Sequence, residues 1–200
     1  MNHLQKFLAT ATGVAVTAAL VTASPAAAQF RATSDETGDV WMLNDDNSYS
    51  QVEAGRDNVD VVRSTVRHSD RRVSAAVRYD ELVRNKDTVT SIVRLRTSGK
   101  RTYVLQLTAG PEDREGTVAF GRYTVDGLVD VDCSSIRKAV RYAKDRLVVS
   151  VGRACLKRPR WVRYSGEAVA VEEGPGTSYT DALLSGDPVN DLMSERIQHG

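Results

Sequence analysis

The acid-rich segment SDETGDVWMLNDDNSY, residues 34–49, holds the side chains best suited to binding a metal ion. Carboxylate oxygens are the hard ligands that Ca²⁺ prefers, and the spacing differs from the D-x-D-x-D-G loop of an EF-hand. We predict a calcium site of another geometry here, with a solvated turn before the first core strand as the alternative. The candidate ligands are Asp35, Asp39, Asp45 and Asp46.

Histidine is too scarce for the common catalytic machinery. Of the three histidines, His3 and His199 lie near the ends of the chain, so a nucleophilic triad would depend on His68. His68 lies in STVRHSDRRV beside a Ser-Asp turn, where we expect a surface histidine. The sequence contains no Walker loop, dinucleotide fingerprint or nucleophile elbow. We therefore assign no catalytic residue.

The stretch VGRACLKRPRWVRY, residues 151–164, combines five basic residues with two aromatic ones. Basic and aromatic side chains interleaved in this way are typical of surfaces that bind nucleic acid. Strand alternation, however, places Trp161 and Arg163 on one face and Val162 on the other, so the basic set cannot align fully. We keep Arg160, Trp161 and Arg163 as candidate binding residues and predict no nucleic-acid partner.

The two cysteines, Cys133 and Cys155, are predicted to form a disulfide because disulfides persist in exported proteins. If residues 138–152 form a hairpin that turns at Lys144, Val140 lies opposite Val148. The cysteines then meet at the open end of that hairpin. A helix over residues 136–147 is the alternative.

The N-terminus has the three parts of a signal peptide. A single lysine in MNHLQK precedes the apolar run FLATATGVAVTAALVTAS, and small residues lead to a predicted cleavage after Ala28. A membrane anchor is the alternative, but the run is shorter than the roughly 20 apolar residues that span a bilayer. Removing residues 1–28 takes one lysine from 27 basic residues and none of the 26 acidic ones, so the mature net charge is zero. We predict a secreted protein with no membrane anchor after cleavage.

Residues 29–171 have the period-two alternation of β-strands. RVSAAVRY places Val73 and Val77 on one face, and TVTSIVRLRT places Val89 and Leu95 on one face. A hairpin turn at residues 98–100 joins the latter to RTYVLQLT. In VDVVRSTVRHS the alternation groups Val62, Ser64 and Val66. The fold class predicted is all-β, an antiparallel β-sandwich or jelly roll with one disulfide. Residues 172–200, rich in acids, glycine and proline, are predicted to be a flexible acidic tail.

Three stretches carry a resemblance. DNVDVVRSTVRH, VSAAVRYDEL and CLKRPRWVRY together resemble a group of small secreted β-rich proteins of Gram-positive bacteria, over residues 39–165. The most specific element is the C-L-x-x-P-x-W-V-R run. The GDV opening and the strand rhythm are more distantly similar to β-sandwich modules of the carbohydrate-binding and DOMON-like kind. These resemblances imply a fold class and export, and supply no ligand residue.

Together these features favour a secreted, non-enzymatic β-sandwich that binds a glycan, a polymer or a protein at the cell envelope. Export, the disulfide and the shortage of catalytic residue types support it, and Trp41, Tyr49 and Trp161 are aromatics able to stack on sugars. The alternative is a secreted hydrolase that uses carboxylates or calcium. Calcium is the one cofactor the sequence suggests.

Overall fold

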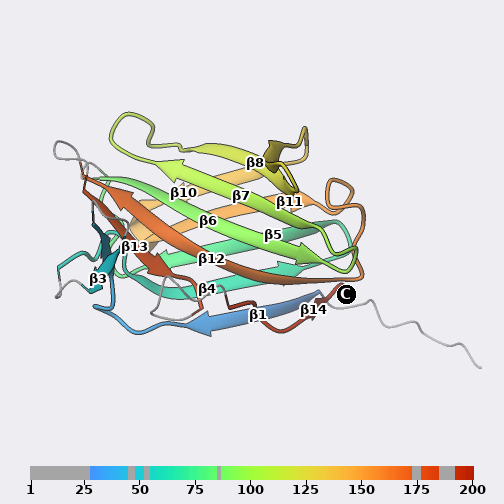
Figure 1. Cartoon of the computed structure of the whole chain (residues 1–200), viewed down its shortest axis with the longest axis horizontal. Coiled ribbons are helices and arrows are strands. Elements are labelled where there is room, and N and C mark those ends of the chain that lie inside the picture. The colour runs from blue at the N-terminus through green and yellow to red at the C-terminus, as the bar shows by residue number, and fades with distance from the viewer. Residues whose placement is uncertain (1–27, 45–47, 52–54, 85–86, 173–176, 185–191) are drawn as a thin grey trace, which may run out of the picture.

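The computed structural model describes residues 28–44, 48–51, 55–84, 87–172, 177–184 and 192–200. Its strands form two antiparallel sheets that lie face to face (Figure 1). Over the described residues the elements are strands and one short 3-10 turn, Tyr142–Lys144. The predicted all-β, antiparallel fold class is therefore confirmed. The predicted signal peptide lies outside the described residues.

The first sheet, sheet A, has five strands, and the three inner ones are hydrogen-bonded on both sides. In sheet order they are β1 (Gln29–Ser34), β4 (Val61–His68), β5 (Arg72–Tyr79), β11 (Arg146–Gly152) and β10 (Arg137–Arg141).

The second sheet, sheet B, is larger and is centred on the long strands β12 and β6. In sheet order it contains β3 (Tyr49–Gln51), β2 (Trp41–Leu43), β13 (Ser178–Ala182), β12 (Trp161–Val171), β6 (Thr88–Thr97), β7 (Thr102–Ala109), β8 (Thr117–Thr124) and β9 (Gly127–Asp130). The short strand β14 (Ile197–Gln198) also pairs with β12.

The core lies between the sheets and is formed by the strand faces that the alternation predicts. In β5, Val73 and Val77 are buried, and in β6, Val89 and Leu95 are buried. Burying such aliphatic side chains stabilises the fold by about 1.5–3 kcal/mol each. The predicted turn at residues 98–100 joins β6 to β7, where Lys100 takes a positive φ of 58°.

The inward face of β4 differs from the predicted one at its start. Ser64 and Val66 are buried as expected, but Val61 is buried in place of Val62, which is only half-buried. The register between β4 and β5 shifts between Val61 and Arg63, as a β-bulge produces. The extra residue moves the alternation by one position.

The hairpin over residues 137–152 is confirmed, and the alternative helix is wrong. Its register is shifted by one residue from the predicted one, so that Val140 lies opposite Leu147 and not Val148. The turn occupies four residues, 142–145, and its last residue, Asp145, has a left-handed backbone conformation (φ 49°). A turn centred on Lys144 would need an odd number of residues, so the observed turn sets the register.

The disulfide between Cys133 and Cys155 is confirmed, with Cα atoms 5.9 Å apart. It lies just beyond the open end of the β10–β11 hairpin, as predicted.

The sandwich also extends past Val171, the boundary predicted for its end. Strands β13 and β14 come from the segment predicted to be a flexible acidic tail. Within the described part of the chain, no helix is long and apolar enough to cross a bilayer.

Candidate metal centre

Four aspartates meet at one end of the sandwich, and they come from both sheets. Asp35 follows β1 and Asp60 precedes β4, both in sheet A. Asp39 precedes β2, and Asp181 lies within β13, both in sheet B. Gly38, at a φ of 82°, supports the turn that carries the chain from β1 to β2, a backbone conformation that favours glycine.

Three of these carboxylates are close enough to share one ion. One carboxylate oxygen from each of Asp39, Asp60 and Asp181 lies within 4.8 Å of the other two. Two calcium ligands on opposite sides of an ion are separated by about twice the 2.3–2.6 Å coordination distance. The cluster therefore has the dimensions of a single calcium site.

One oxygen of each aspartate is buried and accepts no hydrogen bond in the described structure. These atoms are Asp35 Oδ2, Asp39 Oδ1, Asp60 Oδ1 and Asp181 Oδ1. The other oxygen of Asp60 accepts from the Gly38 backbone N–H at 2.6 Å, and that of Asp181 accepts from Val61 N–H at 2.6 Å. Backbone donors thus orient two carboxylates while leaving an oxygen of each without a donor. Such orphaned buried acceptors are costly unless a cation or proton compensates them.

The electrostatics of the cluster favour a cation. Burial raises the pKa of Asp181 to about 9, and the neighbouring carboxylates add to the rise. Burial, with the charge of Asp39, raises the pKa of Asp35 to about 7. The pKa values of Asp39 and Asp60 are also raised, first by burial. The described ion pairs involve none of these four carboxylates.

The donor set fits Ca²⁺ better than Mg²⁺. Calcium takes six to eight oxygens in flexible geometry, whereas magnesium demands near-octahedral ligands at about 2.0–2.1 Å. Asp60 and Asp181 are 3% and 0% exposed, while Asp35 and Asp39 are half-buried. The half-buried pair is the part of the cluster closer to solvent.

Two of the four predicted ligand positions lie in this cluster, and the calcium site itself stays a prediction. Asp35 and Asp39 lie in the cluster, whereas Asp45 and Asp46 lie outside the described residues. Sequence reasoning missed Asp60 and Asp181. Asp181 lies two residues from the buried Tyr179 and from the buried Leu183. Residues two apart share a face of a strand, so an acid in phase with apolar residues is the signal that could have revealed it.

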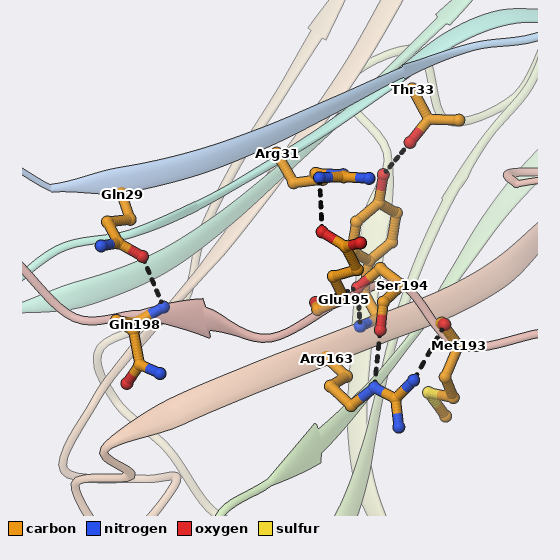
Figure 2. Close-up of polar contacts among 9 residues, drawn as sticks. Gln29, Arg31, Thr33, Arg163, Met193, Ser194, Glu195 and Gln198 are labelled. Atoms are coloured by element: carbon orange, nitrogen blue, oxygen red, sulfur yellow. Dashed lines mark hydrogen bonds and ion pairs between the residues drawn. The ribbon is translucent and has the colours of Figure 1, made fainter.

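Of the predicted binding residues, Arg160 and Trp161 line one hollow, and Arg163 contacts the C-terminal segment. Arg163 donates from Nε to the Ser194 carbonyl at 2.6 Å and holds the C-terminal segment (Figure 2). The guanidinium of Arg196 lies 4.7 Å from the centre of the Trp161 ring. Arg160 is exposed and lines a hollow of about 450 Å³ together with Trp161.

His68 is fully buried, so the expectation of a surface histidine is wrong. It ends β4 on the inward face, and its Nδ1 lies 3.1 Å from the carbonyl of Ile197. The C-terminal segment covers this position, and the sequence predicts that this segment is a flexible tail. Its buried place suits a packing role.

The geometry defines a β-sandwich with a candidate cation site between its sheets. No protein-family model matches the chain, no curated protein matches it, and no solved structure matches it.

Proposed function

We propose that this protein is a secreted, non-enzymatic β-sandwich that binds Ca²⁺ at the Asp35, Asp39, Asp60 and Asp181 cluster and binds a component of the cell envelope. The observation that carries the calcium assignment is the set of buried carboxylate oxygens without donors. Export rests on the signal-peptide pattern, and the disulfide is consistent with it.

The burial of the cluster favours binding over hydrolysis. Asp60 and Asp181 are almost completely enclosed, so a glycan chain has no access to the two carboxylates with the least exposure. A hydrolase needs both its acid and its base within reach of the scissile bond. A single ion is far smaller than a glycan chain, so binding an ion does not require an open cleft at the carboxylates.

Calcium would also do structural work at this position. Asp35 and Asp60 extend from sheet A, and Asp39 and Asp181 from sheet B, so one ion would join the two sheets. It would also neutralise carboxylates that repel one another when ionised. The ion should therefore stabilise the folded protein by an amount that grows with its free concentration.

The test is calorimetric titration of chelator-treated protein, residues 29–200, with Ca²⁺, alongside thermal melting. We expect saturable binding and a melting temperature that rises with calcium and much less with Mg²⁺. Asp39→Asn removes a half-buried ligand and should weaken calcium binding by at least about tenfold. Asp126→Asn, an exposed aspartate in the β8–β9 turn, is the matched control and should bind as the wild type does.

A titration with no heat and no shift in melting removes the calcium assignment. The envelope part is tested separately, by pull-down with cell-wall material beside a panel of hydrolase substrates. Binding without turnover supports the proposal. Turnover that is lost in Asp39→Asn supports the hydrolase instead.

A further inference from the structure

The outer face of sheet A is unusual in its charge. None of its five strands contains an acidic residue. Six arginines on this face are exposed: Arg63, Arg67, Arg78, Arg137, Arg141 and Arg146. The mature chain as a whole is neutral, so this concentration of one sign reflects placement and not composition.

The strand register aligns four of these arginines in one row. Arg63 on β4 lies opposite Arg78 on β5, which lies opposite Arg146 on β11. Arg146 in turn lies opposite Arg141 on β10. Neighbouring strands are about 4.8 Å apart, so the row spans about 14 Å across the sheet.

Small residues lie beside this row and form the floor of a groove. The next row on the same face pairs Thr65 with Ala76 and Ala76 with Val148. The following row contains Arg67 and Arg137, with Ser74 and Ser150 between them. A hollow of about 240 Å³ lies within this groove. Its lining residues are Arg63, Thr65, Ala76, Arg78 and Arg146.

The arginines of the row have no acidic partner among the described residues. The ion pairs found there lie elsewhere and involve Arg31, Arg56, Arg94 and His199. Asp80, which follows β5, forms none with the row. Like charges held about 5 Å apart without counter-charges repel one another, and an anionic ligand would relieve that repulsion.

We propose that this groove binds a linear polymer of phosphodiester groups, such as an anionic glycopolymer of the cell envelope. The inference rests on the proposed envelope-binding function and names its partner, but it does not depend on the calcium site. Guanidinium groups bind phosphate oxygens in a bidentate manner, and a row of them matches a chain with one charge per repeat.

A phosphate polymer fits this face better than an acidic peptide does. The floor belongs to β4, β5 and β11, which are inner strands whose backbone groups are already paired. A peptide on this face would lay its N–H and C=O groups over Ala76 and Val148 without partners. A phosphodiester chain carries its anions in its own backbone and needs no such partners.

The experiment measures binding of poly(glycerol phosphate) to the protein, residues 29–200, with and without calcium, over a range of salt concentrations. The triple variant Arg63→Gln, Arg78→Gln, Arg146→Gln should lose affinity by at least about tenfold. The plot of log affinity against log salt should become less steep, with the magnitude of its negative slope reduced by about two, since three phosphate contacts are removed. Neutral dextran should not bind either protein.

A matched control removes the same charge elsewhere. Arg96→Gln, Arg101→Gln and Arg114→Gln are at exposed positions outside the groove, and Arg101 lines the larger basic hollow. This control should bind almost as the wild type does, and equal losses in both triples would overturn the assignment to the groove. Poly-L-glutamate that binds more tightly through the same arginines would overturn the choice of phosphate. Loss of polymer binding in the groove variant with calcium binding retained separates this proposal from the calcium site.

Discussion

His68 shows how one buried side chain links stability to pH. Its Nδ1 donates a hydrogen bond to the Ile197 carbonyl, because a carbonyl can only accept, while Nε2 is buried without a partner. Burial lowers the pKa of His68, and the nearby charges of Arg153 and His199 lower it further. The folded protein therefore keeps His68 neutral at a pH where the unfolded chain begins to protonate it.

The pH prediction follows from that difference. The unfolded histidine has a pKa of 6.5, and the folded one lies below it, so the unfolded state binds the proton first as pH falls. The contribution of His68 to stability should therefore decrease on acidification below about 6.5 and stop decreasing below the folded pKa. The buried aspartates, whose pKa values are raised, act in the opposite direction, so the test compares two proteins. Over pH 7.5 to 5, the melting temperature of the wild type should fall more, or rise less, than that of His68→Gln.

His199→Gln is the comparison for this slope, because His199 is exposed and its charge only adds to a shift in the pKa of His68 that burial dominates. We expect it to keep most of the wild-type slope. The slope is the measured quantity, since His68→Gln is expected to lower the absolute melting temperature at every pH. An unchanged slope in His68→Gln would show that other groups dominate the pH dependence.

At the scale of elements, the β10–β11 hairpin depends on its covalent closure. β10 is an edge strand of five residues that pairs with β11 alone. Its residues are half-buried or exposed, so packing contributes little to holding it. The bridge between Cys133 and Cys155 closes a loop with a sequence separation of 22 just beyond its open end.

Removing the bridge should therefore be costly. In the chain-entropy model, a loop of this size stabilises the folded state by about 3 kcal/mol. The double variant Cys133→Ser, Cys155→Ser should lose about this much free energy of unfolding in denaturant titration. The wild type under reducing conditions should move toward the variant. A variant as stable as the oxidised wild type would mean that the hairpin holds itself.

The strands were predictable from the sequence because alternation is a local property. Val73, Val77, Val89 and Leu95 are inward wherever the pairing runs without interruption. The failures occur where a non-local event shifts the phase. The bulge at Val62 and the four-residue turn before Arg146 each move the register by one residue, and neither has a strong local signature.

The candidate site was predictable only in part for a related reason. Asp35 and Asp39 are conspicuous because they lie in one acidic segment. Asp60 and Asp181 are 121 residues apart and meet only through the packing of sheet A on sheet B. The compositional change after Val171 predicts a tail, and that prediction concealed the strand that carries Asp181.

At the scale of the whole molecule, charge is divided between two places. Carboxylates lie together at one end of the sandwich, between the sheets. On the outer face of sheet A, every ionisable residue of the strands is an arginine. The small net charge of the whole chain, +1, gives no sign of this division. The two proposed binding surfaces have opposite charge and share no residue, so their tests can be read separately.

The C-terminal segment, residues 192–200, joins the two sheets on the side away from β10. Ile197 pairs with Val162 of β12 in sheet B, and its carbonyl bonds His68 of β4 in sheet A. Figure 2 shows the contacts to β1, where Glu195 pairs with Arg31 and the Gln198 N–H donates to Gln29. The segment thus connects the β1 and β4 side of sheet A to β12 of sheet B.

Truncation after residue 191 should accordingly destabilise the sandwich. It removes the buried Ile197 and two hydrogen bonds, one from the Ser194 N–H to the Tyr164 carbonyl and one from the Tyr164 N–H to Ser194 Oγ, together worth roughly 3–5 kcal/mol. Urea titration should show this loss, whereas Glu195→Gln, which breaks only an exposed ion pair, should cost less than about 1 kcal/mol. Because truncation exposes His68, the steep pH dependence should disappear with the segment. A truncated protein that keeps both its stability and that pH dependence would show that the segment lies on the surface without joining the sheets.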